Sequence, residues 1–402
     1  MTGLIVQEWI ERSGGAEQVL DALRIALPDS RLFALWCDDD ERFAPDTVAE
    51  SWMARTTLRR HKALALPLMS STWKRARVDF EPDWVLTSTY VFAHHCRFGA
   101  VDGSTPKFSY VHTPARYLWE PSLDGRGAGA LMSAPRSVLR AVDRAAARDA
   151  GDLAANSEFV RRRIIRAWER DARVIYPPVD AAGIVEGGEW RDRLTEQEQD
   201  ILESLPERGF LMAASRLVPY KRHDAVIGMG RRIGVPVVLA GTGPEAARLQ
   251  ALAAESTVPV HMLGFVSDAM MRALFQRALV FVFPPVEDFG IIPVEAMAAG
   301  CPVIVNRIGG AAESVLDGVT GFHVDIDDPV AVASAVDRAG SLDAGDARRR
   351  ALSFDTARFL EDVSRWILGP AEAGRAAAAQ AGATLTSSAR DESPKIAARA
   401  AG

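Results

Sequence analysis

The chain has 402 residues, more than one compact core holds, so we expect two domains. Its composition, 48% hydrophobic and 25% charged, is that of a globular protein, and it has no apolar run of about 18 residues to span a membrane. A net charge of −6 argues against nucleic acid as a partner. Three scattered cysteines and the absence of a signal peptide favour a reducing cytoplasm.

Short apolar runs alternate with helical patterns over residues 1–180, which predicts a first Rossmann-like domain. Gly14 and Gly15 precede its first helix, where glycine backbone can approach a ligand closely. His112 follows the expected strand 107–111, at the strand end where doubly wound folds place ligands. The expected strands are 4–6, 31–36, 84–87, 107–111, 153–155 and 174–176.

Three consecutive acids, Asp38, Asp39 and Asp40, follow the second of these strands. They could form an Asp-x-Asp site for a divalent ion on a diphosphate. We favour a polar turn, which is what acids after a strand usually form, and expect no metal.

Residues 51–78 form a basic, amphipathic stretch with seven cations and no acid, interleaved with leucines and tryptophans. A solvated helical face is one interpretation. A surface for anionic lipid or for a phosphorylated acceptor is the other, and it would place the protein at the inner face of a membrane. Both interpretations remain open at the level of the sequence.

Residues 181–207 are polar and rich in glutamate, and we expect them to be a linker. The second Rossmann-like domain then spans 208–345, with a charged loop at 341–350. Residues 351–368 have apolar positions at helical spacing and should pack back on the protein. The tail, 371–402, is expected to be disordered. The strands expected in the second domain are 210–214, 236–240, 258–263, 279–283, 302–305 and 321–324.

A dinucleotide fingerprint, Gly-x-Gly-x-x-Ala, follows one of these strands at Gly241, so a nicotinamide-dependent oxidoreductase must be considered. We reject it because no acid near position 261 follows to bind a ribose. Arg216 and Lys221 follow the strand 210–214. Two cations at a strand end can neutralise a diphosphate leaving group without a metal.

The most informative stretch begins where the strand 279–283 ends at two prolines. Glu287 lies in a short loop that closes at Gly290, and Pro293 is expected to open a helix with Glu295 in its first turn. The N–H groups of such a helix terminus attract phosphate, and carboxylates accept hydrogen bonds from sugar hydroxyls. A nucleotide sugar carries both groups.

The stretch 284–304 reads Pro-x-x-Glu-x-Phe-Gly-x-x-Pro-x-Glu-Ala-Met-Ala-x-Gly-x-Pro-Val-Ile. It closely resembles the donor site of glycosyltransferase family 4, the retaining enzymes of GT-B fold, and looks most like the mannosyltransferase branch of bacterial polysaccharide assembly. That branch usually has Asp where this chain has Glu120. Further segments that resemble the family are 14–17, 110–114, 155–157, 176–180, 215–217 with Lys221, 241–244 and 263–268.

The resemblance implies a role for each matching residue. Glu287 would contact the transferred sugar and Glu295 the nucleotide ribose. Arg216 and Lys221 would hold the diphosphate, and His112 would reach the sugar from the first domain. The glycine pair Gly14–Gly15 would lie close to the diphosphate, backbone amides of Phe289, Gly290 and Ile291 would hold sugar or phosphates, and Gly264, Phe265 and Val266 would lie near the base.

The sequence therefore predicts a GT-B enzyme with two parallel sheets facing a central cleft. Its expected activity is metal-independent, retaining transfer of a hexose, with mannose favoured, from a nucleoside-diphosphate sugar, with GDP-mannose favoured, to a glycan or lipid-linked acceptor. Two alternatives stay open. One is a glucosyl- or other hexosyltransferase with a soluble acceptor, and the other is a catalytically silent sugar-nucleotide-binding protein.

Overall fold

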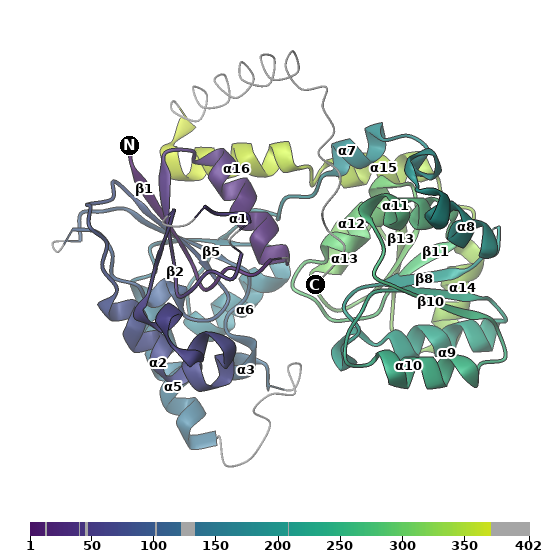
Figure 1. Cartoon of the computed structure of the whole chain (residues 1–402), viewed down its shortest axis with the longest axis horizontal. Helices are drawn as coiled ribbons and strands as arrows, with labels where there is room; N and C mark the ends of the chain where they lie inside the picture. Colours follow the sequence, from purple (N-terminus) through teal and green to yellow (C-terminus); the bar gives the residue numbers. More distant parts are fainter. Residues whose placement is uncertain are drawn as a thin grey trace.

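A computed structural model describes residues 1–370 except 13, 40, 45–46, 101–102, 122–132 and 208. These residues form two α/β domains that lie side by side, each built on a parallel sheet (Figure 1). The two-domain, doubly wound architecture predicted from the sequence is confirmed. The tail expected to be disordered, 371–402, lies outside the described residues.

The sheet of the N-terminal domain has seven parallel strands in the order β3-β2-β1-β4-β5-β6-β7. Its strands are apolar on both faces because helices cover both. In β1, Ile5 packs toward α1 while Leu4 and Val6 join a cluster with Trp36 and Trp73 on the other face. The elements of this domain are β1 Gly3–Gln7, α1 Gly15–Ala26, β2 Ser30–Ala34, β3 Val48–Glu50, α2 Lys62–Arg75, β4 Val85–Thr89, β5 Lys107–Val111, α3 Arg116–Trp119, α5 Ser133–Arg148, β6 Asp152–Ala155, α6 Glu158–Trp168 and β7 Arg173–Val174, with short 3-10 helices η1 Trp52–Arg55, η2 Thr57–Arg60 and η3 Ala93–His95.

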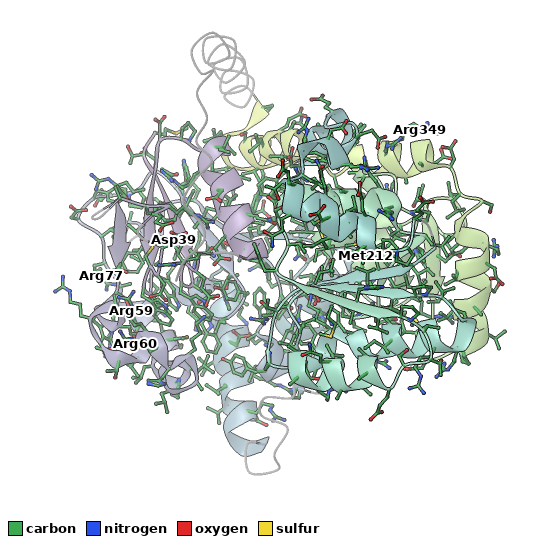
Figure 2. The ribbon with its side chains drawn as sticks, turned by 45° about the vertical axis from the view of Figure 1, so that its right-hand side comes forward. Asp39, Arg59, Arg60, Arg77, Met212 and Arg349 are labelled. Carbon is green, nitrogen blue, oxygen red and sulfur yellow. The ribbon has the colours of Figure 1, made fainter. Side chains whose placement is uncertain are left out.

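The basic stretch 51–78 folds into η1, η2 and α2 at the outside of this domain. Arg60 and Arg77 lie on the side away from the C-terminal domain (Figure 2). None of the helices that the described residues form is both long enough and apolar enough to cross a bilayer.

The sheet of the C-terminal domain has six parallel strands in the order β10-β9-β8-β11-β12-β13. The strand β11 lies at its centre, so the loop that follows β11 opens at the carboxyl edge of the sheet, where α/β folds bind ligands. The elements are β8 Leu211–Ala214, α9 His223–Ile233, β9 Val237–Ala240, α10 Ala246–Ala254, β10 Val260–Gly264, α11 Asp268–Arg277, β11 Val280–Phe283, α12 Ile291–Ala298, β12 Val303–Asn306, α13 Ala311–Ser314, β13 Gly321–Val324, α14 Pro329–Ala339, α15 Ala344–Leu352 and the 3-10 helix η6 Pro219–Lys221.

The segment 181–207 differs from the linker expected from its composition. It forms α7 Ala181–Glu186, the 3-10 helix η5 Trp190–Arg193 and α8 Glu196–Ser204. Ile184, Trp190 and Leu202 are buried in the core of the C-terminal domain. The glutamates of this segment face water while a few widely spaced apolar side chains anchor it, a pattern that average polarity conceals. Likewise α15 occupies most of the stretch expected to be a charged loop.

The helix α16, Thr356–Leu368, returns to the N-terminal domain (Figure 1). Phe359, Val363 and Trp366 pack in the core beside α1. The Trp366 Nε1–H also donates to Asp152 at 2.9 Å. The chain therefore crosses between the domains twice, once before α7 and once before α16.

Candidate functional site

The centre of the site is the loop between β11 and α12. Gly290 adopts φ +92°, in the left-handed region that suits glycine, and directs the chain into α12 at Ile291. The helix therefore begins two residues before Pro293, and Glu295 lies in its second turn rather than its first. No side chain caps this N-terminus. The arrangement leaves the helix start open to an anionic group.

Glu287, in this loop, is held between one cation from each domain. Lys221 Nζ lies 2.7 Å from its Oε1, and an Arg116 Nη donates to its Oε2 at 3.1 Å. Burial opposes ionisation of the carboxyl, but the two cations outweigh it and hold the pKa of Glu287 below its ordinary value. Glu287 is therefore ionised and oriented, as a group that accepts hydrogen bonds from a sugar must be.

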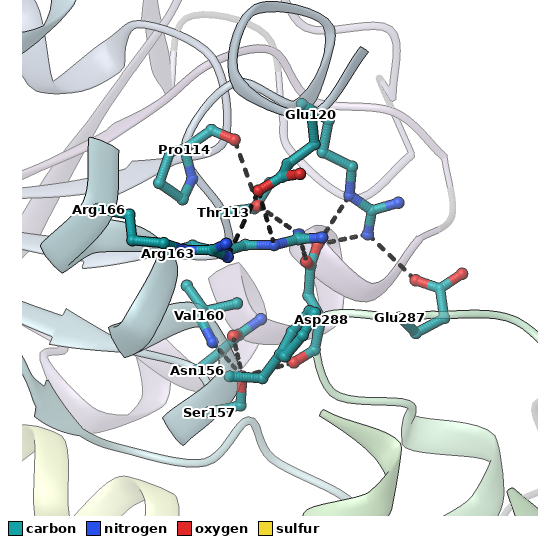
Figure 3. Close-up of polar contacts among 12 residues, drawn as sticks. Thr113, Pro114, Glu120, Asn156, Ser157, Val160, Arg163, Arg166, Glu287 and Asp288 are labelled. Atoms are coloured by element: carbon teal, nitrogen blue, oxygen red, sulfur yellow. Dashed lines mark hydrogen bonds and ion pairs between the residues drawn. The ribbon is translucent and has the colours of Figure 1, made fainter. Parts of the chain in front are cut away.

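The neighbouring Asp288 joins the two domains directly (Figure 3). Its Oδ1 accepts a hydrogen bond from an Arg163 Nη at 2.5 Å, and its Oδ2 accepts one from the Arg116 Nε at 3.0 Å. Ser157 Oγ donates to the Asp288 carbonyl, and the same oxygen caps α6 by accepting from Val160 N. Asp288 is 8% exposed, so these bonds are largely shielded from water. The contact that Arg116, Ser157 and Arg163 make with Asp288 across the domain boundary is called the seam below.

Gly14 and Gly15 lie on the opposite side of the seam, at the start of α1. A Cβ at Gly15 would lie 3.5 Å from Ile291 Cδ1, so the glycine loop faces the N-terminus of α12 across the domain boundary. This places a loop without side chains beside the helix start, where a diphosphate would need close approach of the backbone.

Glu295 lies on the wall of a cavity of about 300 Å³ between the domains. The cavity is lined by α1 on one side and by α11 and α12 on the other, including Asp21, Asp268 and Arg272. Burial raises the pKa of Glu295 to about 7; Arg272 opposes this rise, while Asp268 and Asp180 add to it. Glu295 therefore changes between its protonated and its ionised form near neutral pH.

His112 lies at the carboxyl end of β5, where its Nε2 and Ser88 Oγ are 2.8 Å apart. The rings of Tyr90 and Tyr110 pack edge-on against it. Burial lowers the pKa of His112 to about 4, so the imidazole is neutral at pH 7. It can exchange hydrogen bonds with a hydroxyl but carries no charge.

The other predicted donor residues differ in how they are presented. Arg216 is exposed and has no ion pair with any residue that the structure describes. Phe265, after β10, is 84% exposed, whereas Val266 packs against the core. The Phe289 side chain is buried against Tyr176 and Phe354, which leaves its backbone to face a ligand.

Sequence reasoning gave no role to Arg116, Arg163 or Asp288. Arg116 lies two residues beyond the segment 110–114, and Asp288 occupies a variable position of the stretch 284–304, directly after Glu287. Nothing in the sequence indicates that residues 172 apart, as Arg116 and Asp288 are, should meet. Folding of both domains brings them together.

The described part of the Asp38–Asp40 stretch has its carboxylates engaged by neighbouring groups, and Asp39 is buried. Arg59 forms an ion pair with Asp38, and Asp39 Oδ1 accepts a hydrogen bond from Arg42 N at 3.0 Å. Asp40 lies outside the described residues. These interactions use the carboxylates within the N-terminal domain.

Another buried carboxylate, Asp143 of α5, lies beside His94 and His95 in an arrangement that could suggest a metal site. Its Oδ2 already accepts hydrogen bonds from the indoles of Trp119, at 2.7 Å, and Trp168, at 2.8 Å. Its Oδ1 lies 3.1 Å from the Nε2 atoms of both histidines. With hydrogen bonds from Trp119, Trp168 and His95, and with His94 in contact, Asp143 is the hub of a hydrogen-bond network.

Comparison with known families matches both halves of the chain. A family model described as Glycosyltransferase Family 4 matches residues 13–182, and one described as Glycosyl transferases group 1 matches residues 195–352. Together they cover both domains and all of the candidate site.

Two curated relatives illustrate the range of similar proteins. A GDP-mannose-dependent alpha-(1-6)-phosphatidylinositol monomannoside mannosyltransferase of Mycolicibacterium smegmatis is 31% identical over 59% of this chain and 63% of its own length. A D-inositol 3-phosphate glycosyltransferase of Salinispora tropica is 30% identical over 54% of this chain and 50% of its own length. The matches thus span half to just under two thirds of these relatives.

Among solved structures, HepE of Anabaena in complex with UDP superposes with a TM-score of 0.66 at 17% identity, over 91% of this chain and 99% of HepE. At that identity the likeness concerns the fold. It confirms the GT-B arrangement of two Rossmann-like domains that the resemblance implied.

Proposed function

Because the chain belongs to the family 4-like glycosyltransferases of GT-B fold, we propose that it is a retaining hexosyltransferase. It transfers a hexose, with mannose favoured, from a nucleoside-diphosphate sugar to a glycan or lipid-linked acceptor. The observation that carries this proposal is the ionised Glu287, held between Lys221 and Arg116 beside the open N-terminus of α12.

Each group in the site has a chemical task in this reaction. The α12 N-terminus and the glycine loop receive the diphosphate, and Glu287 accepts hydrogen bonds from the sugar. Lys221 and Arg216 stabilise the charge that grows on the diphosphate as its bond to the anomeric carbon breaks. The leaving phosphate oxygen takes the acceptor proton on the face of departure, which accounts for retention without a side-chain base.

Glu295 and the adjoining cavity support a nucleotide site. An ionised carboxylate accepts hydrogen bonds from the two ribose hydroxyls, and the cavity beside it has space for part of the nucleoside. The M. smegmatis relative is named for GDP-mannose, which favours GDP-mannose as the donor here.

The basic stretch 51–78 supports an acceptor presented at an anionic membrane. Trp52, Leu64 and Leu68 are exposed, and so are Arg55 and Arg60, so both apolar side chains and cations of this stretch reach solvent. Arg59 and Lys62 contribute less, because they form ion pairs with Asp38 and Glu11. Each remaining cation near an anionic leaflet would add about 1 kcal/mol of attraction.

A soluble acceptor is the second candidate. It is favoured by the relative named as a D-inositol 3-phosphate glycosyltransferase, because D-inositol 3-phosphate is a small phosphorylated polyol. A phosphorylated acceptor could also use the cations of the basic stretch. Both candidates share the donor chemistry and differ in the acceptor.

The donor is tested by thermal shift with GDP, UDP, ADP, GDP-mannose and UDP-glucose, because ligand binding raises the melting temperature by mass action. GDP and GDP-mannose should give the largest shifts. Transfer from that donor, followed by proton NMR of the new linkage, then tests retention, with EDTA present to test metal independence. No shift with any nucleotide would contradict the proposal, and inversion would contradict the mechanism.

A further inference from the structure

Two arginines of the N-terminal domain converge on one carboxylate of the C-terminal domain. Arg116 comes from α3 and Arg163 from α6, and each donates to a different oxygen of Asp288. Figure 3 shows Arg163 and Asp288. The Arg163 side chain is only 4% exposed, so its positive charge is stabilised mainly by the ion pair with Asp288. Glu120, at 3.8 Å, is a more distant neighbour. Buried charges without a partner are strongly disfavoured, so this contact is energetically coupled across the domains.

The start of α6 adds a second contact across the same boundary. Glu313 of α13 accepts hydrogen bonds from Glu158 N at 2.7 Å and from Phe159 N at 2.5 Å, the first two residues of α6. A carboxylate at a helix N-terminus satisfies free N–H groups and complements the helix dipole. The C-terminal domain thus caps a helix of the N-terminal domain.

The two arginine-bearing elements are themselves fixed by Asp143. Its Oδ2 receives the indole N–H of Trp119, the last residue of α3, and of Trp168, the last residue of α6. Asp143 is fully buried and therefore holds the far ends of α3 and α6 together. This sets the spacing at which Arg116 and Arg163 reach Asp288.

Arg116 also has a second partner, Glu287. The Nη that contacts Asp288 Oδ2 also donates to Glu287 Oε2 at 3.1 Å. Asp288 binds this guanidinium through two of its nitrogens, Nε and Nη, which fixes the plane of the group. The orientation of Arg116 toward the sugar-binding carboxylate therefore depends on Asp288.

We propose that Arg116 and Arg163 form an arginine clamp on Asp288 that closes the two domains over the donor site, and that Asp288 is a positioning residue for transfer. The clamp delivers Arg116 to Glu287 when the domains are together and withdraws it when they part. Its effect on transfer rests on the hexosyltransferase activity proposed above, whereas its effect on closure does not.

Hydrogen exchange tests closure without any substrate. In Asp288→Asn, which keeps the shape of the side chain but removes its charge, the amides of Glu158 and Phe159 should exchange about 10-fold faster or more, because loss of a buried charge pair weakens the contact that shields them. Amides in the last turn of α6 provide an internal reference and should not change. Arg163→Met should reproduce the effect, which guards against a folding defect peculiar to one variant.

Transfer kinetics test positioning. Asp288→Asn and Arg163→Met should each lower kcat by about 100-fold, the scale of a misplaced catalytic group, while binding of the bare nucleoside diphosphate changes by less than about threefold. The double variant should lose no more than the worse single variant, because both remove one interaction. Asp288→Glu should restore part of the loss.

Arg166→Met is the matched control. Arg166 lies one turn along α6 from Arg163, is 66% exposed, and pairs with Glu120 of its own domain at 3.5 Å. It should leave both exchange and transfer at wild-type levels. Unchanged exchange in both clamp variants would overturn the clamp, and faster exchange with full kcat would overturn the positioning role of Asp288. If the wild type transfers no sugar, the proposed function fails, and hydrogen exchange alone still decides whether the clamp closes the domains.

Discussion

Asp143 and Asp288 are both buried carboxylates that hold α3 and α6, yet they do so with opposite chemistry. Asp143 binds the two helices through neutral indoles inside one domain, and its four partners all come from that domain. Asp288 binds them through guanidiniums from another domain. The first arrangement suits a permanent junction, while the second can open, because separated arginines and a carboxylate regain water as a partner. Burial is therefore common to both carboxylates. What differs is whether the partners come from the same domain, as for Asp143, or from the other domain, as for Asp288.

The largest effect on the rate of transfer is expected at the two cations proposed to hold the diphosphate, because negative charge develops there during the reaction. Lys221→Ala and Arg216→Ala should each lower kcat by about 100-fold or more, because both cations are proposed to stabilise the leaving diphosphate. Steady-state kinetics with the donor identified by thermal shift measure this. Arg222→Ala is a nearby control, since Arg222 pairs with Asp327 at the surface. Full turnover in either variant would remove that cation from the mechanism.

The two glutamates of the α12 region should separate binding from transfer. Glu295→Gln should weaken binding of the bare nucleoside diphosphate by about 1 to 3 kcal/mol, the cost of losing charged hydrogen bonds to ribose. Glu287→Gln should leave that affinity nearly unchanged and lower kcat. Titration calorimetry and initial rates distinguish the two. Equal losses of nucleotide affinity would contradict the division between sugar and ribose.

The raised pKa of Glu295, about 7, adds a pH dependence with a definite sign. The ionised carboxylate is the better acceptor for ribose hydroxyls, so nucleotide affinity should rise as pH increases through about 7 and level off above it. Nucleotide phosphates titrate in the same range, and Glu295→Gln controls for them. The part of the pH profile that disappears in Glu295→Gln belongs to Glu295; identical profiles would refute the assignment.

The permanent junction is tested through stability. Asp143→Asn should lower the free energy of unfolding by about 1 to 3 kcal/mol, because buried indole and imidazole N–H groups lose a charged acceptor. Asp152→Asn is a matched control: Asp152 also accepts from an indole, that of Trp366, but its side chain is 50% exposed. Asp152→Asn should lower the free energy of unfolding by less than about 1 kcal/mol. Urea denaturation followed by tryptophan fluorescence compares the two, and equal losses would mean that burial of Asp143 adds nothing.

The smallest effect is expected at the outer surface, where cations remain in water. Arg55→Glu with Arg60→Glu should reduce sedimentation with anionic vesicles, at about 1 kcal/mol for each charge near the surface, and high salt should do the same to the wild type. Neutral vesicles should bind neither protein. Arg191→Glu, on the C-terminal domain, is the control. Equal absence of binding to both vesicle types would favour the soluble acceptor.

Local sequence was sufficient to predict most of the framework. The strands β4, β5, β8, β9, β11, β12 and β13 fall within a residue or two of the expected runs, because buried parallel strands are continuously apolar and end at glycine, proline or polar residues. The three-residue strand β3 was missed, since Val48–Glu50 has only one large apolar side chain. The candidate donor residues around 287–295 were predicted from their spacing along one loop and helix, and their role in donor binding stays a prediction.

What the sequence determined by itself is therefore the fold class, the family and the groups that lie within one loop and helix, since spacing along a chain fixes their geometry. Only the tertiary structure decided that residues 181–207 belong to the second domain, that α16 returns to the first, and that Arg116 and Arg163 meet Asp288. Each of these depends on contacts between segments far apart in sequence. The physical reason is that the free energy of such contacts comes from shared burial and charge compensation, which exist only after both partners have folded.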